Sequence, residues 1–231
     1  VANDQSWDLV HPAKPGSTLM EKGAHQRADG MWVYQTLPAT TLWDTIMKST
    51  YDFAEPGILF LDHINKDNNL NYCEVIEATN PCGELPLSAG ESCLLGSINL
   101  ARMVNGGKLD EGLLTETVSI AVRFLDDILD IAQYPLELIA EATRATRKIG
   151  LGFTGLVDAL IKLNVPYDSP EGRATAEHIT KLIRDTAHAV SQDLAEEKGC
   201  FPLWEESVFY PEQKRRNATC LAIAPTGSVT T

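Results

Sequence analysis

The sequence lacks any long hydrophobic run. No stretch of about 18 apolar residues occurs within its 231 residues, so we expect no membrane-spanning helix and no membrane partner. The first residues carry no basic and apolar signal pattern, and the chain does not begin with Met. We therefore expect no secretion signal, and we interpret the chain as a fragment of a longer protein.

Positive charge is scarce as well. The chain has 19 Lys and Arg residues against 32 Asp and Glu residues, which gives a formal net charge of -13. An acidic protein repels a phosphate backbone, so we do not expect nucleic acid as a partner. The apolar content of 44% is ordinary for a globular protein, and the length is sufficient for one sizeable core or two small ones.

Cysteine is sparse and irregularly spaced. The five Cys residues, an odd number, do not resemble the disulfide framework of a small secreted protein. The chain also has no Cys-x-x-Cys pair, which argues against a zinc site, and we expect no metal site. This use of cysteine indicates a reducing compartment and hence a cytoplasmic protein.

What the sequence does contain is a cluster of reactive side chains in residues 79–100. Asn80, Cys82 and Glu84 recur with a period of two, which places them on one side of an extended backbone. Pro81 favours an extended conformation for the residue before it, so we expect this geometry here. An amide, a thiol and a carboxylate would then converge on one small volume.

Several chemistries fit a thiol in this setting. Cys82 is a candidate nucleophile, metal ligand, disulfide partner or one-electron centre, and a second thiol, Cys93, follows eleven residues later. A nucleophilic Cys usually has a cation beside it, and the nearest His in the sequence, His63, is distant. A thiol beside an acid suits hydrogen-atom chemistry better. Spacing alone favours a buried Cys in a Pro-Gly turn beside a solvated Glu84, so both interpretations stay open at this point.

The periodicity of the chain predicts an α/β fold, in which strands alternate with several helices. Helices are expected at 39–54, from Asp110 to Ala132, from Pro135 to about Lys148, at 153–163 and at 170–198. Short strands are expected at 8–10 and 31–34, and buried strands at 57–61 and 219–224.

Two glycine-containing stretches, 150–155 and 225–228, have the composition of nucleotide- or phosphate-binding loops. Gly150, Gly152 and Gly155 form a G-x-G-x-x-G pattern, but a helix rather than a strand is expected before it, so we expect a tight turn between helices instead of a dinucleotide site. Near the end, Pro225-Thr226-Gly227-Ser228 follows an apolar run and offers hydroxyls and backbone N–H groups to an anion. It lacks the lysine of a P-loop, and an ordinary capped turn explains it equally well.

Taken together, these motifs resemble the ribonucleotide reductase catalytic subunit. The segments 79–84 and 93–100 resemble its active site, and the gap between the two cysteines most resembles the adenosylcobalamin-dependent class II. Residues 147–152 resemble a recurrent stretch of the family, and 225–228 resemble its substrate-phosphate loop.

This resemblance implies a part of a ten-stranded α/β barrel with the radical cysteine on an internal loop. Residues 1–231 would be a central fragment of the barrel, with 1–38 as a peripheral hairpin region and 39–231 as barrel strands and helices. The upstream partner of Cys93 and a C-terminal cysteine pair would lie outside the chain. We therefore expect the fragment to be inactive alone.

The resemblance also implies the chemistry. Cys82 would carry a thiyl radical, Glu84 would act as base, Asn80 would hold the substrate hydroxyls, and Cys93 would deliver electrons. Pro225, Thr226, Gly227 and Ser228 would bind the substrate phosphates. The implied reaction is ribonucleotide reduction of the ribonucleoside-diphosphate reductase type, with adenosylcobalamin (vitamin B12) as cofactor.

The implied partners are the ribonucleotide substrate, the remaining segments of the same subunit, a thioredoxin-type reductant and, in the complete protein, a second copy. Two alternatives stay open. One is the catalytic subunit of an iron-dependent class I reductase, which obtains its radical from a second protein. The other is a non-catalytic fragment that acts only by docking to the rest of its subunit.

Overall fold

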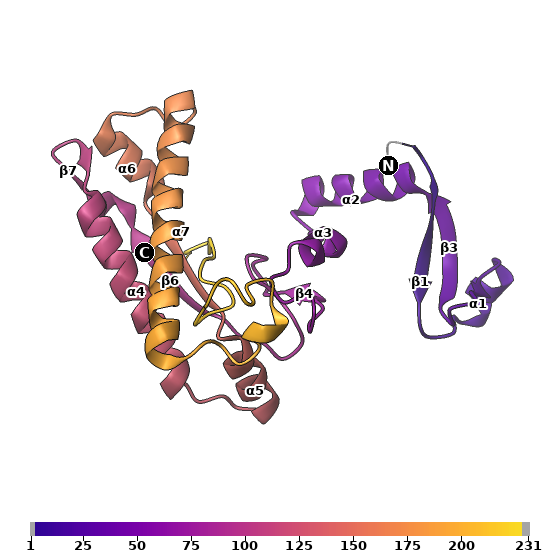
Figure 1. Cartoon of the computed structure of the whole chain (residues 1–231). Helices are drawn as coiled ribbons and strands as arrows, with labels where there is room; N and C mark the ends of the chain where they lie inside the picture. Colours follow the sequence, from indigo (N-terminus) through magenta and orange to yellow (C-terminus); the bar gives the residue numbers. More distant parts are fainter. Residues whose placement is uncertain (1–2, 228–231) are drawn as a thin grey trace. The chain divides into compact units, whose positions relative to one another are not determined.

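The computed structural model describes residues 3–227, and the chain divides into two compact units, Val1–Leu59 and Phe60–Thr231 (Figure 1). Helix α2 (Ala39–Phe53) belongs to the first unit together with the expected hairpin region 1–38. The functional division into a peripheral and a barrel part stays a prediction. No helix within the described part of the chain has the length and hydropathy that crossing a membrane requires.

The first unit is an antiparallel sheet with two helices. β3 lies in the middle of the sheet and pairs with β1 on one side and β2 on the other. The predicted strands at 8–10 and 31–34 and the predicted helix at 39–54 are confirmed. The elements are β1 (Ser6–His11), α1 (Ser17–Glu21), β2 (His25–Gln26), β3 (Trp32–Pro38) and α2.

The buried strand predicted at 57–61 is wrong. Ile58, Leu59 and Phe60 are exposed, and helix α3 (Leu61–Lys66) begins at the end of the run. No strand within residues 3–227 pairs with this run, so its backbone has no sheet to join. A short apolar run indicates burial only where other elements cover it.

The second unit contains the parallel part of the fold. β6 (Leu94–Asn99) pairs in parallel with β9 (Ile149–Thr154). On the other side of β9, residues 219–222 run parallel to it through three backbone hydrogen bonds of 2.9–3.2 Å and a bridge between Leu151 and Leu221. The strand predicted at 219–224 is therefore present as a short bridged segment. Helices separate the three parallel segments along the chain, which confirms the predicted α/β class.

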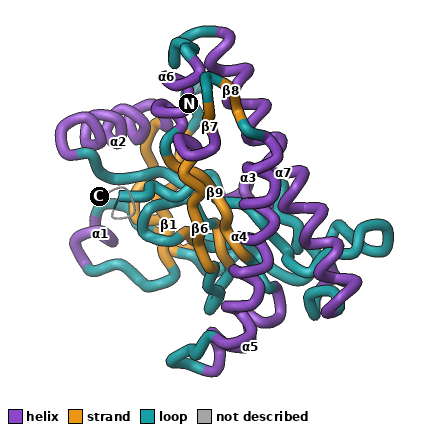
Figure 2. The backbone as a smooth tube through the Cα atoms, turned by 90° about the vertical axis from the view of Figure 1, so that its left-hand side faces the viewer, coloured by secondary structure: helices purple, strands orange, loops and turns teal. Residues whose placement is uncertain are grey.

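Helices cover one face of these parallel segments. α4 packs against β6, β9 and α7 (Figures 1 and 2). The helices predicted in this region are confirmed, including the N-caps: the carboxylate of Asp110 accepts from the Leu113 N–H at 2.9 Å, and the hydroxyl of Ser169 accepts from the Gly172 N–H at 2.9 Å. The helices are α4 (Glu111–Ile131), α5 (Glu137–Thr146), α6 (Leu156–Leu163), α7 (Pro170–Lys198) and the short 3-10 turns at Leu100–Met103 and Trp204–Glu206.

The hydrophobic core lies between the helices and the parallel segments. Most of its fully buried side chains come from α4, β9 and α7, and they include Leu114, Val118, Ile149, Ile179 and Leu194. Two short hairpins complete the unit. They are β4 (Ala78–Thr79) with β5 (Pro86–Leu87), and β7 (Val104–Asn105) with β8 (Lys108–Leu109).

The glycine-rich stretch is a strand and not the predicted helix-to-helix turn. Gly150 and Gly152 lie inside β9. Glycine is required at both positions because neighbouring segments of the chain approach too closely for a side chain. A methyl group at Gly150 would lie 2.7 Å from Leu95 Cδ2, and one at Gly152 would lie 2.2 Å from the Ala222 carbonyl oxygen. The expected close packing is present, but between strands. The glycines also lie within the strand rather than after it, unlike a dinucleotide fingerprint.

A buried carboxylate ties α4 to the segments that surround β9. The Asp126 carboxylate accepts hydrogen bonds from Arg147 Nη2 at 2.7 Å, from Arg216 Nε at 3.3 Å and from the Asn217 amide nitrogen at 3.0 Å. Burial alone would raise the pKa of Asp126, but the hydrogen bonds and charges of Arg147 and Arg216 lower it below its usual value. The ionised form therefore stabilises the fold.

Candidate active site

The motif residues lie on a short hairpin. β4 and β5 pair antiparallel, with Thr79 opposite Pro86, and the loop 80–85 joins them. The Asn80 carbonyl accepts the Gly83 N–H at 3.0 Å, and the Asn80 side-chain oxygen accepts the Leu85 N–H at 3.0 Å.

Cys82 therefore lies in a turn and not in the expected extended segment. Gly83 has a φ of +85°, a value that a side chain would oppose. The turn forms because Pro81 suits the first central position of a β-turn and Asn80 folds its side chain back onto the loop. The amide, thiol and carboxylate still share one loop, as the sequence suggested.

The two reactive groups on this loop differ in exposure. Cys82 is an exposed free thiol, so it is not the buried structural cysteine of the simpler interpretation. The Glu84 side chain is half-buried, and its Oε2 atom is buried without a hydrogen-bond partner among the described residues. A buried oxygen without a partner is costly to the fold and is available to a ligand.

The second thiol lies at the start of β6. Burial raises the pKa of Cys93 to about 12; the charge of Lys148 acts to lower it, and the charges of Glu91 and Glu84 add to the rise. The charge of Glu84 is the smallest of these influences on the thiol. At neutral pH Cys93 is a protonated thiol.

Cys93 faces the side of the sheet that is turned away from the helices. Ile149 and Leu151 point into the helical core, so the intervening Gly150 faces the other side by the alternation of a strand. A methyl group at Gly150 would lie 3.3 Å from Cys93 Sγ and 2.9 Å from the Ala222 side chain. The glycine leaves the space that this thiol occupies.

Lys148, Glu74 and Glu91 form a buried ion triad close to Cys93 that the sequence did not predict. Lys148 Nζ donates to Glu74 at 2.9 Å and to Glu91 at 2.6 Å, and all three side chains are less than a tenth exposed. Glu91 Oε2 also accepts the Ser88 N–H at 3.0 Å. The triad fixes the hairpin segment to the start of β9. Its members are 57 and 74 residues apart in the chain, so no local pattern could have revealed it.

The expected phosphate loop follows the carboxyl end of the bridged segment 219–222. Pro225, Thr226 and Gly227 are described, and Thr226 has a φ of +55°, in the left-handed region. Ser228, the fourth residue of the prediction, lies outside the described residues.

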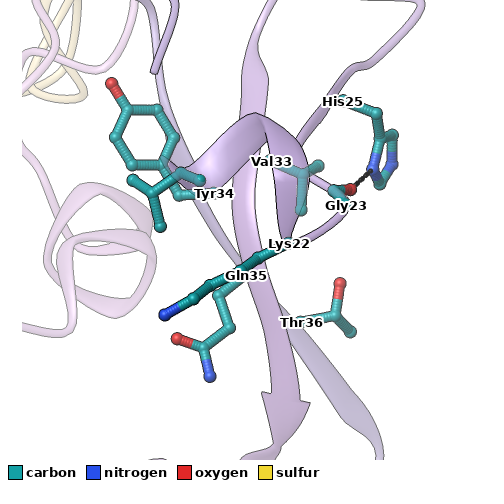
Figure 3. Close-up of a pocket in the computed structure, with 8 residues that line it drawn as sticks. Lys22, Gly23, His25, Val33, Tyr34, Gln35 and Thr36 are labelled. Carbon is teal, nitrogen blue, oxygen red and sulfur yellow. Dashed lines mark hydrogen bonds between the residues drawn. The ribbon is translucent and has the colours of Figure 1, made fainter. Parts of the chain in front are cut away.

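One cavity lies away from these residues. It has a volume of about 420 Å³ and lies in the first unit between α1, β2 and β3 (Figure 3). Lys22, Tyr34, Gln35 and Thr36 line it, and the His25 ring nitrogen is 3.2 Å from the Gly23 carbonyl. None of its lining residues belongs to the predicted site, so it does not coincide with the thiols.

One group of carboxylates among residues 3–227 has the spacing of a metal site. Asp126, Asp127 and Asp130 bring their oxygens within 4.8 Å of one another. Arg147 bonds both Asp126 and Asp130, at 2.7 and 2.8 Å, and Lys198 contacts all three carboxylates. These cations already neutralise the group, so it is explained as a structural ion cluster.

The comparisons with known proteins agree with the family that the motifs suggested. The profile of the family described as "Ribonucleotide reductase, barrel domain" matches residues 1–215. The vitamin B12-dependent ribonucleoside-diphosphate reductase of Mycobacterium tuberculosis (strain CDC 1551 / Oshkosh) is 48% identical over 193 residues, which are 84% of this chain and 28% of that protein. The enzyme of the same name from Thermoplasma acidophilum is 47% identical over 229 residues, 98% of this chain and 28% of that protein.

A solved structure shows the same likeness. The Actinobacillus ureae class Id ribonucleotide reductase alpha subunit aligns with a TM-score of 0.70 and 26% identity, over 83% of this chain and 37% of that chain. The chain thus spans little more than a quarter of the length of the two relatives named above. The resemblance drawn from the motifs is confirmed, and the chain belongs to the ribonucleotide reductase barrel-domain family.

Proposed function

We propose that this chain forms the central part of the catalytic subunit of a ribonucleotide reductase. The complete protein would reduce ribonucleoside diphosphates to deoxyribonucleotides for DNA synthesis by a thiyl-radical mechanism. Family membership and the names of the relatives support this proposal. The observation that carries it is the loop 80–85, which exposes the Cys82 thiol and holds a buried Glu84 oxygen that has no hydrogen-bond partner in the described part of the chain.

Cys82 begins and ends the proposed reaction. Its thiyl radical takes the hydrogen atom from C3′ of the ribose, so an S–H bond forms as a C–H bond breaks. The two bonds are similar in strength, which makes the step reversible and allows the same hydrogen atom to be returned to C3′. The exposed position of the thiol supports this role, because the ribose has to reach the sulfur atom.

Glu84 and Asn80 act on the ribose hydroxyls in this proposal. Glu84 accepts the proton of the 3′-hydroxyl, which helps the 2′-hydroxyl to leave as water. Its buried Oε2 atom has the free acceptor capacity that this step needs. The Asn80 side-chain oxygen already accepts from Leu85, so the amide nitrogen is the group that donates to a hydroxyl.

Cys93 supplies reducing equivalents together with a cysteine outside this chain. The two thiols lose two electrons and two protons and form a disulfide, while the ribose gains a hydrogen and releases water. The raised pKa of Cys93 supports this role, because the thiol keeps its proton until it reacts. A thioredoxin-type reductant would then reduce the disulfide by thiol exchange.

The loop of Pro225, Thr226, Gly227 and Ser228 would hold the substrate phosphates. Backbone N–H groups and hydroxyls in a turn after a parallel strand suit a phosphate. The left-handed conformation of Thr226 supports a tight turn at this point. Ser228 completes the proposed set from outside the described residues.

Adenosylcobalamin is the proposed cofactor. When bound, it supplies the one-electron oxidation that makes Cys82 a thiyl radical. The exposed position of Cys82 fits this, because an external group has to reach the sulfur. The choice of cofactor rests on the relatives, which are named vitamin B12-dependent. The remaining segments of the subunit and a second copy are proposed as partners in a cytoplasmic enzyme.

The test is an assay of the complete protein. Reduction of ribonucleoside diphosphates should require adenosylcobalamin, and Cys82→Ser should abolish it. Cys73→Ser is the matched control, because Cys73 is also an exposed free thiol and lies outside the loop. Turnover without cobalamin would refute the cofactor and favour a reductase whose radical comes from a second protein. Turnover by Cys82→Ser would refute the mechanism.

A further inference from the structure

The guanidinium of Arg215 is a buried charge without an anionic partner in the described part of the chain. The residue is 5% exposed, and no ion pair to a carboxylate within residues 3–227 includes it. Its contacts are a long hydrogen bond of 3.4 Å to the Gln213 side chain and stacking over Phe209 at 5.0 Å. Its Nε atom is buried and has no hydrogen-bond partner among residues 3–227.

Such an arrangement is unfavourable unless something completes it. Buried charges in proteins are almost always paired, and stacking on an aromatic ring offsets only part of the lost hydration. Burial lowers the pKa of Arg215, which shows the same cost. Asp126, in contrast, is buried with three cationic side chains around it. The other buried charges of the described residues, Asp126, Arg147 and Lys148, are thus paired, whereas Arg215 has no anionic partner among these residues.

Arg215 also lines a cavity of about 260 Å³. Asn69, His188 and Cys220 line the same cavity, and the described lining contains no carboxylate. Arg184 and Arg215 both act on His188 with positive charge, and burial together with these charges lowers the pKa of His188. The cavity therefore combines space and a positive potential with an arginine that has no carboxylate partner among the described residues.

We propose that this cavity binds an oxyanion, a phosphate or carboxylate group, through Arg215. A guanidinium suits such a group because its planar N–H donors match two oxygens at once. The site is separate from the loop proposed for the substrate phosphates. Arg215 precedes the parallel segment 219–222, whereas that loop follows it. The inference does not depend on the proposed function.

The anion has two sources to consider. One is a free anion such as inorganic phosphate, and the other is a carboxylate from a part of the subunit outside this chain, which spans 28% of its relatives. The response of the His188 pKa to added phosphate distinguishes them, because an anion that enters the cavity raises this pKa. The charged groups that act on His188 are Arg184 and Asp185 on its own helix and Arg215, which lines the same cavity together with the Cys220 thiol.

The experiment measures the pKa of His188 by NMR in the complete protein. Inorganic phosphate is titrated against sodium chloride at equal ionic strength, and His188→Gln identifies the signal. A free-anion site predicts a saturable rise in this pKa with phosphate. Arg215→Met should abolish the rise and Arg215→Lys should keep part of it. Arg173→Met removes an exposed arginine from α7, the helix that carries His188, and should leave the rise in pKa unchanged.

A carboxylate from the subunit itself predicts a different result. Phosphate would then leave His188 unchanged, and Arg215→Met would lower the melting temperature while Arg173→Met would not. The proposal is overturned if the phosphate response persists in Arg215→Met. It is equally overturned if phosphate has no effect and Arg215→Met is as stable as the unmodified protein.

Discussion

Cys93 shows how residues far apart in the chain set the chemistry of one atom. Its thiol pKa is raised to about 12, first by burial and then by the charges of Glu91 and Glu84, while Lys148 acts in the opposite direction. The sequence identified Cys93 from a motif, but it could not provide this environment. Lys148, which lies just before β9, is 55 residues from Cys93 in the chain, yet its charge acts on the thiol. It pairs with Glu91, two residues before Cys93.

Alkylation of Cys93 tests this environment. With iodoacetamide, the rate at Cys93 should rise with pH up to a pKa of about 12. Glu91→Gln should lower that pKa and Lys148→Met should raise it, because each removes one of the named charges. A change of one pKa unit alters the thiolate fraction about tenfold. Mass spectrometry of the digested complete protein measures both rates.

The exposed Cys82 in the same sample is the control. Its alkylation rate should be the same in the unmodified protein, in Glu91→Gln and in Lys148→Met. Equal rates for Cys82 and Cys93 at pH 8 would contradict the burial of Cys93. A Lys148→Met variant with a lower Cys93 pKa would contradict the assigned direction of the lysine's effect.

At the scale of elements, local signals predicted the helices well and the strands less well. α4 and α7 were predictable because their caps, Asp110 and Ser169, and their apolar stripes lie close together in the sequence. β9 was misread because Gly150 and Gly152 suggest a turn when considered alone. Their reason is the approach of Leu95 and Ala222, which only the folded chain brings there. The turn at Cys82, in contrast, has local causes, since Pro81 suits a turn and Asn80 closes it by a contact to Leu85. The sequence allowed such a Pro-Gly turn as one of its two interpretations.

Substitution of Gly152 tests the close approach of strands. Gly152→Ala should be strongly destabilising, because the new methyl group would lie 2.2 Å from the Ala222 carbonyl oxygen, and backbone would have to move. Gly16→Ala is the matched control, because nothing lies within 4 Å of its methyl position. Melting temperatures of the complete protein measure the difference. Equal melting temperatures for the two variants would argue against the packing of residues 219–222 on β9.

The Asp126 cluster makes a second prediction for the elements. Asp126→Asn should cost about 3–5 kcal/mol of the free energy of unfolding, because it removes the fully buried carboxylate that Arg147 and Arg216 share. Asp127→Asn should cost little, because this carboxylate is exposed. Denaturant unfolding of both variants is the measurement. A cost for Asp126→Asn no larger than that for Asp127→Asn would contradict the structural role.

The pH dependence follows from the lowered pKa of Asp126. A carboxyl group with a pKa lower in the folded state stabilises the fold fully above its unfolded pKa, about 3.9 for Asp. This stabilisation is lost as the pH falls through the lower pKa of the folded state. Unfolding free energies between pH 6 and 3 should therefore fall less steeply in Asp126→Asn than in the unmodified protein.

At the scale of the whole molecule, the chain is a part of a larger fold. β6 pairs only with β9 within the described residues, and a cavity of about 350 Å³ lies beside it against α4. Phe124 lines this cavity and is 61% exposed. The family assignment explains this open side, because a barrel continues its sheet beyond any one part. The motifs predicted the family, whereas no local pattern predicted that β6 has β9 as its one strand neighbour among the described residues.

The chain of residues 1–231 alone should therefore have no turnover. It lacks the second reducing cysteine of the proposed mechanism, and it spans 28% of the relatives that carry the name of the activity. An assay of deoxynucleotide formation with this chain, adenosylcobalamin and a dithiol measures it. The complete protein serves as the positive control. Product formation by the chain alone would contradict the need for the remaining segments.

The measurement that tests the central claim most directly follows one hydrogen atom. The complete protein is given a ribonucleoside diphosphate with deuterium at C3′, and the product is analysed for its label. If Cys82 removes and returns that atom, kcat/KM should show a deuterium isotope effect, C3′ of the product should keep label, and Cys82→Ser should form no product. Product formation by Cys82→Ser, or turnover without any isotope effect at C3′, would contradict the account.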